Sequence, residues 1–312
     1  MAHSKNTSTV TEFHLLGFQN LSALQALLFP VFLLTYLLTV TGNLTIIVIV
    51  SQNPRLNTPM YTFLKHLSLL EIWYTTTIAP MLLTSLLSWR RAISFPACMT
   101  QLYFFVFFGA TECFLLTTMA YDRYLAICNP LYYTALMSPG ACMKLVVGSW
   151  MAGLWTALVP SLMISKLRFC GPNQIDHFFC DLLPLMQLSC SSTAATETVI
   201  FILSVMVLCI CFLMTLFSYV FIVSTILKIP SASGQRKTFS TCGSHLAVVT
   251  IYYGTMISMY VRPNALLSPD LNKVISVFYT VVTPLLNPIV YSLRNRDFKE
   301  ILRKVVKRNS SI

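Results

Sequence analysis

Seven long apolar stretches alternate with short polar connections along the chain. An α-helix of about 20 mostly apolar residues is long enough to cross the hydrocarbon core of a bilayer. Polar residues inside the second, third and sixth stretches favour a bundle with a polar interior over seven independent anchors. We therefore predict an all-α membrane protein, a seven-transmembrane-helix bundle. The expected helices cover residues 24–50, 60–87, 99–127, 143–164, 199–227, 239–260 and 274–293.

Two short segments flank the predicted bundle of residues 24–293. Residues 1–23 lack the basic start, apolar run and cleavage site of a signal peptide, so we expect the first span to act as an uncleaved anchor. In the tail, residues 294–312, apolar and basic side chains alternate over residues 295–308. This alternation predicts a short amphipathic C-terminal helix on an anionic lipid surface, with a solvated tail as the alternative. The apolar positions are Phe298, Ile301, Leu302 and Val305.

Composition supports lipid as the solvent of most of the chain. Hydrophobic residues make up 56% of it and charged residues only 10%, whereas an ordinary soluble domain carries about 25% charged residues. The net charge of +11 does not indicate nucleic-acid binding, because the basic residues are spread between apolar blocks. The sequence contains no phosphate-binding Gly-rich Lys loop, His-Glu-x-x-His or Gly-x-Ser-x-Gly motif, so we expect no enzyme.

The distribution of basic residues predicts the orientation of the bundle. The face that holds the N-terminus carries 7 Lys and Arg residues and the opposite face carries 14. Because cytoplasmic loops are the more basic ones, we expect the C-terminus in the cytoplasm and the N-terminus outside. The sequon at Asn6 agrees with this orientation, since a glycan is added to Asn6 only outside the cytoplasm.

Motifs at the ends of the predicted helices resemble those of one receptor family. The third helix closes on MAYDRYLAIC (residues 119–128) and the seventh on PLLNPIVY (284–291). The second opens on LNTPMY (56–61), where the family usually has His in place of Asn57, and the sixth on KTFSTCGSHL (237–246). The chain thus resembles the olfactory (odorant) receptors among the rhodopsin-like, class A, G-protein-coupled receptors. Further matches are Gly42–Asn43, Ser218–Tyr219 and the loop cysteines Cys170, Cys180 and Cys190.

The resemblance implies a plasma-membrane receptor for small volatile molecules. Such a receptor binds mostly neutral, apolar ligands in the outer half of its bundle and activates a stimulatory heterotrimeric G protein. The sequence leaves open the same receptor fold sensing a non-odorant small molecule outside the olfactory epithelium. A membrane transporter is disfavoured, because transporters favour repeated halves and several charges along a pathway.

The resemblance also implies an activation switch at the inner end of the bundle. Asp122 would partly neutralise Arg123 in the resting state, and opening of the bundle would free the guanidinium for the G protein. A helix-end anchor is the alternative interpretation of Arg123, since arginine readily reaches the interface. The switch residues expected from the motifs are Asp122, Arg123, Tyr124, Tyr219, Asn287, Pro288 and Tyr291.

Glu71 and Glu112 are the only acidic residues deep within the predicted spans. Carboxylates are costly inside a membrane and mark functional sites. By resemblance, Glu71 stands where class A receptors place a sodium-linked aspartate, with Glu112 at the same depth one helix away. Two neighbouring carboxylates favour either a shared proton or a cation between them. An allosteric sodium ion and a purely structural cluster with Asn43 and Asn287 both stay open, and no other cofactor is expected.

Alignment by motif and helical spacing predicts a ligand pocket without a charge. Amine-binding receptors of this class carry an aspartate at the position of Phe105, and residues 98–110 contain no acid. A buried ammonium would therefore lose its hydration without gaining a partner. The predicted lining is Phe105, Val106, Gly109, Ala110, Leu203, Val207, Tyr253, Met256, Tyr260 and Thr280.

Four of the ten cysteines fall in the outward loops or at their borders: Cys98, Cys170, Cys180 and Cys190. Four cysteines in an oxidising space allow three pairings, and the sequence alone does not choose among them. The family resemblance implies a disulfide between Cys98 and Cys180, which leaves Cys170 and Cys190 as the second pair.

Overall fold

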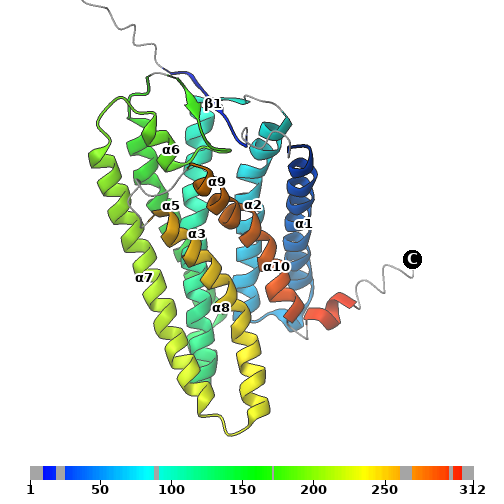
Figure 1. Cartoon of the computed structure of the whole chain (residues 1–312). Coiled ribbons are helices and arrows are strands. Elements are labelled where there is room, and N and C mark those ends of the chain that lie inside the picture. The colour runs from blue at the N-terminus through cyan, green and yellow to red at the C-terminus, as the bar shows by residue number, and fades with distance from the viewer. Residues whose placement is uncertain are drawn as a thin grey trace, which may run out of the picture.

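A computed structural model describes residues 10–18, 25–87, 91–170, 172–260, 269–294 and 298–303. Its long helices form a bundle (Figure 1), which confirms the predicted seven-helix fold. Asn6 and Val305 lie outside the described residues. The seven membrane segments are α1 (Gln25–Gln52), α2 (Pro59–Leu87), α3 (Phe95–Cys128), α5 (Pro139–Ser165), α7 (Ala194–Leu227), α8 (Ala232–Tyr260) and a composite of α9 (Pro269–Val277), η4 (Phe278–Val282) and α10 (Thr283–Arg294).

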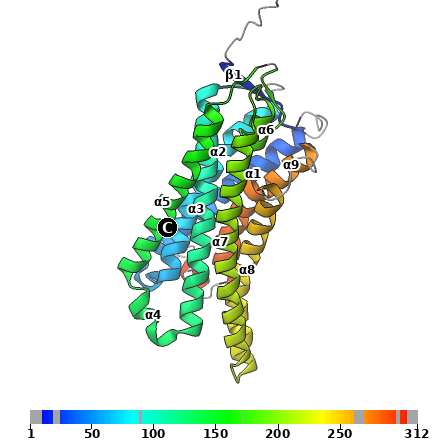
Figure 2. The ribbon, with the colours of Figure 1, turned by 90° about the vertical axis from the view of Figure 1, so that its left-hand side faces the viewer.

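Short elements close the two ends of the bundle. At one end β1 (Glu12–Leu15) lies between β2 (Arg91–Ser94), to which it is antiparallel, and β3 (Gln174–Ile175), to which it is parallel. We call this end the sheet end; α6 (Leu182–Gln187) lies there too. The opposite end, here the α4 end, carries α4 (Pro130–Leu136) and η2 (Pro54–Leu56), and Figure 2 shows α4 far from β1.

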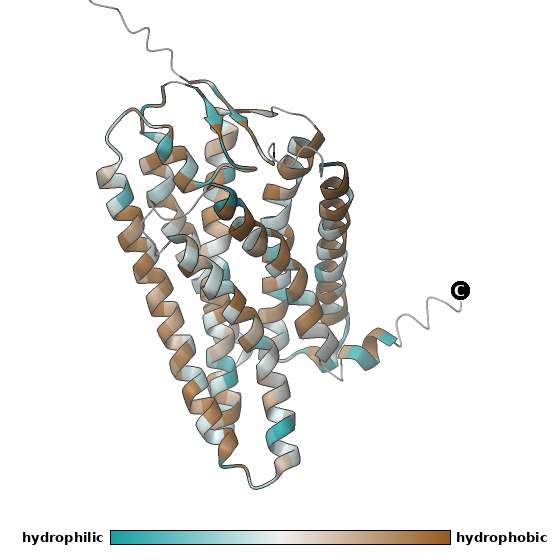
Figure 3. Cartoon of the chain, in the orientation of Figure 1, coloured by the Kyte–Doolittle hydropathy of each residue, from teal (hydrophilic) through white to brown (hydrophobic). Residues whose placement is uncertain are grey.

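The bundle presents apolar side chains outward and buries its strongest polar groups. Along α7, Ile210 and Phe217 are 55% and 61% exposed, whereas Glu71 and Glu112 are fully buried. Figure 3 shows the same inversion as apolar colour along the outside of α1 and α7. An apolar exterior is stable only against lipid. Five described segments are long and apolar enough to cross a membrane by length and composition alone; α2 and α8 are long but more polar.

Local sequence signals explain where two central helices begin. Ser94 precedes α3, and its side chain accepts a hydrogen bond from the Ala97 amide at 3.4 Å. Ser138 precedes α5 and accepts one from Ala141 at the same distance. In both cases a proline follows in the first turn, where its missing N–H costs nothing. These starts fix the heights of α3 and α5, the two helices that carry one wall of the site described next.

Candidate functional site

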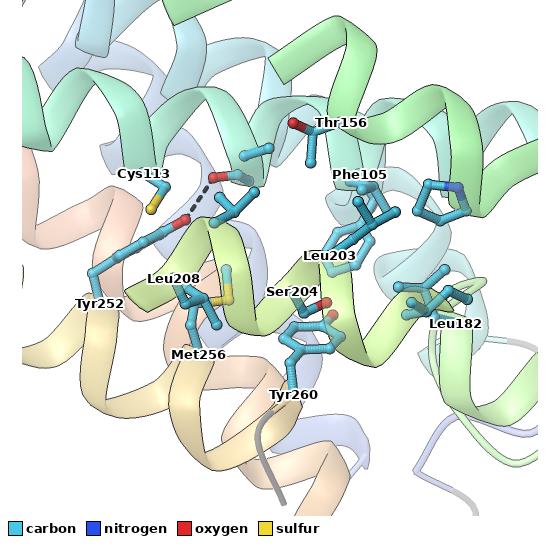
Figure 4. Close-up of a pocket in the computed structure, with 16 residues that line it drawn as sticks. Phe105, Cys113, Thr156, Leu182, Leu203, Ser204, Leu208, Tyr252, Met256 and Tyr260 are labelled. Carbon is cyan, nitrogen blue, oxygen red and sulfur yellow. Dashed lines mark hydrogen bonds between the residues drawn. The ribbon is translucent and has the colours of Figure 1, made fainter. Parts of the chain in front are cut away.

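The main pocket lies between α3, α5, α7 and α8 in the half of the bundle near the sheet end (Figure 4). It contains about 620 Å³ of space free of atoms, including its open mouth. Most of its wall is aliphatic or aromatic, which suits a small apolar ligand. The lining residues are Phe105, Val106, Gly109, Ala110, Cys113, Thr156, Pro160, Leu182, Ile200, Leu203, Ser204, Val207, Leu208, Tyr252, Met256 and Tyr260.

Eight of the residues predicted from the sequence line this pocket, and two lie elsewhere. The hydroxyl of Tyr253 is hydrogen-bonded to Thr117 at 3.2 Å, below the pocket, and its neighbour Tyr252 lines the wall instead. Thr280 lines a separate hollow between α1, α2 and η4, and donates to the Ser276 carbonyl at 2.6 Å. The eight are Phe105, Val106, Gly109, Ala110, Leu203, Val207, Met256 and Tyr260.

Sequence reasoning missed the contribution of α5 and of the loop after it. Thr156 and Pro160 form the α5 side of the pocket, and Leu182 reaches it from α6. The residue in the sequence that could have indicated α5 is Gly153, because a glycine permits close helix packing. In the structure a Cβ at Gly153 would lie 2.0 Å from Thr111 Oγ1 on α3. A glycine that lets two helices approach so closely also brings the next turn of α5 against the pocket.

A lid covers the sheet end of the pocket. We define the lid loop as residues 166–193 between α5 and α7, of which residue 171 is not described. In the structure a disulfide joins Cys180 of this loop to Cys98 at the start of α3, and a second joins Cys170 to Cys190. Phe178, Phe179 and Cys180 are fully buried, so this part of the lid loop packs into the sheet end of the bundle.

Polar contacts tie the lid loop to α8 and α9. Lys273 on α9 forms an ion pair with Asp176 at 2.5 Å, and His177 Nε2 lies 3.2 Å from Ser276 Oγ. Tyr260 on α8 donates to Asp181 Oδ1 at 3.3 Å. Burial, with the Lys273 charge, lowers the pKa of His177 to about 3, and burial raises the pKa of Asp181 to about 6. The lid therefore holds a neutral imidazole at neutral pH.

The two intramembrane acids lie together in the middle of the bundle. Asn287 Nδ2 on α10 donates to Glu71 Oε1, and Glu112 lies close enough to Glu71 to share a hydrogen bond when one of them is protonated. Both Glu112 oxygens, Glu71 Oε2 and Asn287 Oδ1 lack hydrogen-bond donors among the described residues. Asn43 instead donates to the carbonyls of Thr39 and Pro284, at 2.9 and 3.4 Å. Buried oxygen acceptors of this kind are the ligands that a hard cation such as sodium prefers.

The motif residues at the α4 end form a closed arrangement. Arg123 contacts Asp122 at 2.5 Å, and Tyr133 on α4 donates to the other Asp122 oxygen at 2.8 Å. Tyr219 on α7 hydrogen-bonds to His245 Nδ1 on α8 at 2.6 Å, which joins these two helices at the same end. Among the other motif residues, Tyr124 packs on Tyr121 and Phe221, and Pro288 faces Gly42. The side chain of Tyr291 lies outside the described residues.

Known proteins match this chain over nearly its whole length. The model of a family described as "Olfactory receptor" matches residues 32–309. Olfactory receptor 11L1 from Homo sapiens is 70% identical over 308 residues, which is 99% of this chain and 96% of that protein. Olfactory receptor 6N1 from Homo sapiens is 48% identical, with 97% of each chain covered. Olfactory receptor 5M5 from Mus musculus is 48% identical, with 97% of this chain and 96% of its own covered.

Proposed function

The chain belongs to the olfactory receptor family of G-protein-coupled receptors, and from that premise we propose that its pocket binds small, mostly neutral, apolar odorants. It is an odorant receptor of the plasma membrane, not an enzyme, and its partners are a small ligand and a G protein. The finer proposal is that the G protein is the stimulatory olfactory type. The observation that carries the ligand class is the pocket between α3, α5, α7 and α8, whose wall holds no charged side chain.

We propose that the sheet end faces outward and the α4 end faces the cytoplasm. The excess of basic residues on the α4 side supports this orientation, and so do the disulfides at the sheet end, which form in an oxidising space. In this arrangement residues 1–23 are extracellular and open to glycosylation at Asn6. Residues 294–312 are cytoplasmic, and the described helical residues 298–303 pack Phe298 against Ile46, Ile49 and Tyr61 beside the lipid surface.

The switch proposal assigns the ion pair of Asp122 and Arg123 to the resting receptor. Tyr133 shares Asp122, so the pair also ties α3 to α4. A ligand shifts such an equilibrium only by binding one packing of the bundle better than the other. In the active packing Arg123 leaves Asp122 and contacts the G protein, and Tyr124, Tyr219, Asn287, Pro288 and Tyr291 complete the rearranged end.

Replacing Arg123 tests the switch. We expect Arg123→Ala to bind agonist with an affinity within about twofold of wild type, because Arg123 lies far from the pocket lining. Agonist-driven nucleotide exchange on the G protein should fall to the basal rate. Lys144→Ala, which removes an exposed cation at the same end that pairs with no described residue, is the control. Equal exchange by Arg123→Ala and wild type at matched surface expression would rule out the switch.

We further propose that Glu71 and Glu112 bind a sodium ion that favours the resting packing. The orphaned oxygens of Glu112, Glu71 and Asn287 would supply its ligands, and the ion would offset the charge of two buried carboxylates. Raising sodium at constant ionic strength should then weaken agonist binding to wild type, with potassium as the control ion. Glu112→Gln should abolish this sodium dependence; a variant as sodium-sensitive as wild type would contradict the proposal.

A further inference from the structure

Hydroxyl groups in these helices are mostly occupied by the backbone of their own helix. Thr198 on α7 donates to the Ala194 carbonyl at 2.8 Å, and Thr156 on α5 donates to the Ala152 carbonyl at the same distance. This bond to the carbonyl four residues earlier satisfies the hydroxyl where water is absent. A hydroxyl in the pocket that lacks such a bond therefore has donor capacity left for a ligand.

Four hydroxyl-bearing side chains line the pocket: Thr156, Ser204, Tyr252 and Tyr260. Three of them already donate. Thr156 donates within α5, Tyr252 donates to the Gly109 carbonyl at 2.5 Å, and Tyr260 donates to Asp181. A hydroxyl has one proton to give, so none of the three has a second one for a ligand.

Ser204 on α7 is the exception in the pocket. Among the described residues its hydroxyl has no hydrogen-bond partner, and it makes no bond to the Ile200 carbonyl one turn earlier. It lies on the pocket wall and is half-buried. Figure 4 shows Ser204 on the pocket wall, with the side chains of Tyr260 and Leu203 labelled among the lining residues. Of the four hydroxyls in the lining, Ser204 is thus the one with a proton left to donate to a ligand.

We propose that Ser204 determines ligand specificity by donating a hydrogen bond to the carbonyl oxygen of a small aliphatic ketone, aldehyde or ester. The proposal rests on the proposed function, because it names the ligand class of that same pocket. The carbonyl oxygen would sit at Ser204, and the hydrocarbon chain would lie along Val106, Gly109 and Ala110 on α3. Transfer of that chain from water supplies most of the affinity, and the hydrogen bond supplies orientation.

Counting donors and acceptors explains why a carbonyl fits this wall better than an amine does. A carbonyl only accepts, so the single spare proton of Ser204 satisfies it. An alcohol both accepts and donates, and the oxygens of Ser204 and Tyr260 can accept its proton, so an alcohol can also be satisfied here. An ammonium has three donors to satisfy and a charge to bury, at a cost far above that of one unmade neutral bond. Asp181 stands behind Tyr260 and does not line the pocket.

Binding to purified full-length receptor tests the proposal without requiring a G protein. The probes are 2-octanone, octanal, 1-octanol, octylamine and n-octane, and the readout is the apparent Kd from ligand-induced thermal stabilisation. Ser204→Ala removes the hydroxyl, and Ser204→Thr keeps it. Thr198→Val is the matched control, because it removes a hydroxyl from the same helix that is already bonded to Ala194 and lies outside the pocket.

We expect 2-octanone, octanal and 1-octanol to bind wild type more tightly than octylamine or n-octane, because Ser204 can donate to the oxygen of each of the first three. Ser204→Ala should weaken that binding by about fivefold to tenfold, the effect of one neutral hydrogen bond, while n-octane binds both proteins equally. Ser204→Thr and Thr198→Val should bind the ketone like wild type. The proposal is overturned by equal ketone affinity in Ser204→Ala and wild type, by tighter binding of octylamine, or by no ketone or aldehyde binding at all. Ketone binding that depends on Ser204 but raises no cyclic AMP in cells would support the proposal and contradict the stimulatory coupling instead.

Discussion

His177 is a buried imidazole in the lid loop whose environment opposes protonation. Its ring stacks on Phe178 with centroids 4.6 Å apart, and the Lys273 ammonium on α9 adds a positive charge nearby. Its Nε2 reaches Ser276 on the same segment, so the neutral ring links the lid loop to α9. The carboxylates near this cluster, Asp176 and Asp181, bond to Lys273 and Tyr260 instead.

The lowered pKa of His177 predicts that the stability of the folded receptor depends on pH. In the unfolded chain the ring binds a proton below about pH 6.5, whereas in the folded state its pKa is about 3, so folded-state stability is lost as pH falls below 6.5. Asp181 acts in the opposite direction, because its raised pKa of about 6 removes stability as pH rises from 3.8 to 6. Comparing His177→Gln with wild type separates the contribution of His177 to the pH dependence from that of Asp181. His177→Gln should gain up to ~2 kcal/mol relative to wild type between pH 7 and pH 5.

Chemical or thermal unfolding of the purified receptor at the two pH values measures this difference. His14→Gln is the control, because the His14 ring on β1 is partly exposed. If the stabilities of His177→Gln and wild type change in parallel as the pH falls, then protonation of His177 does not contribute to the pH dependence of stability.

Single residues also show the limit of reading a pocket from sequence. Helical spacing placed the wall of α8 at Tyr253, Met256 and Tyr260, and the last two do line the pocket. Successive residues on a helix point about 100° apart, so an offset of one residue moves a side chain off the wall. That is the difference between Tyr253, which bonds to Thr117, and Tyr252, which bonds to Gly109. Motif alignment fixes a helix to within a residue, and only packing decides the rest.

Among the elements, α3 and α5 make the closest described approach at a glycine. A Cβ on Gly153 would lie 3.0 Å from the carbonyl oxygen of Phe107 as well as 2.0 Å from Thr111 Oγ1. The Phe107 carbonyl is part of the α3 backbone, and the Thr111 hydroxyl is hydrogen-bonded to it, so an added Cβ would force the helix to move. Membrane helices gain stability from such close packing at small residues. This contact sets the distance between α3 and α5, two neighbouring helices that both line the pocket.

Gly153→Ala should therefore push α5 away from α3. We expect a loss of about 1–3 kcal/mol of stability from overpacking, seen as a lower melting temperature, together with weaker agonist binding. Gly148→Ala is the control on the same helix, because a Cβ there meets nothing within 4 Å. Adding Thr111→Ala to Gly153→Ala should recover part of the loss. Equal melting temperatures for Gly153→Ala and Gly148→Ala would show that the close contact between α3 and α5 does not contribute to stability.

The hydrophobic pattern of the sequence did not predict two kinds of element, a π-helical turn and the short strands. The seventh membrane segment contains the π-helical η4 just before Pro284, where Thr283 Oγ1 donates to the Phe278 carbonyl at 3.1 Å. The strands β1, β2 and β3 are two to four residues long, too short for an alternating pattern. Their pairing depends on loops distant in sequence, such as His14 beside Gln174.

For the molecule as a whole, the bilayer makes the fold readable from sequence. A fixed hydrocarbon thickness sets the length of each apolar stretch, and all seven expected stretches appear as helical segments. The agreement is poorest for the sixth, because α8 begins at Ala232, before the expected start at residue 239. Buried acids and motif residues then mark the interior. The shape of the pocket did not follow from the sequence, because it depends on how the lid loop and α5 pack against α3.

The central claim is that a small molecule in this pocket drives G-protein activation, and Gly109 offers the most direct test. A Cβ at Gly109 would meet only Met256 Cε, at 3.7 Å, so a leucine side chain can extend into the pocket without a backbone clash. Gly254→Leu on α8 is the control, because nothing lies within 4 Å of its Cβ position.

The measurement is the concentration–response curve of cyclic AMP for a carbonyl odorant at matched surface expression. Gly109→Leu should raise the half-maximal concentration at least about tenfold, since each lost 1.4 kcal/mol of binding is a factor of ten, while Gly254→Leu should match wild type. Unchanged odorant potency in Gly109→Leu would contradict the account.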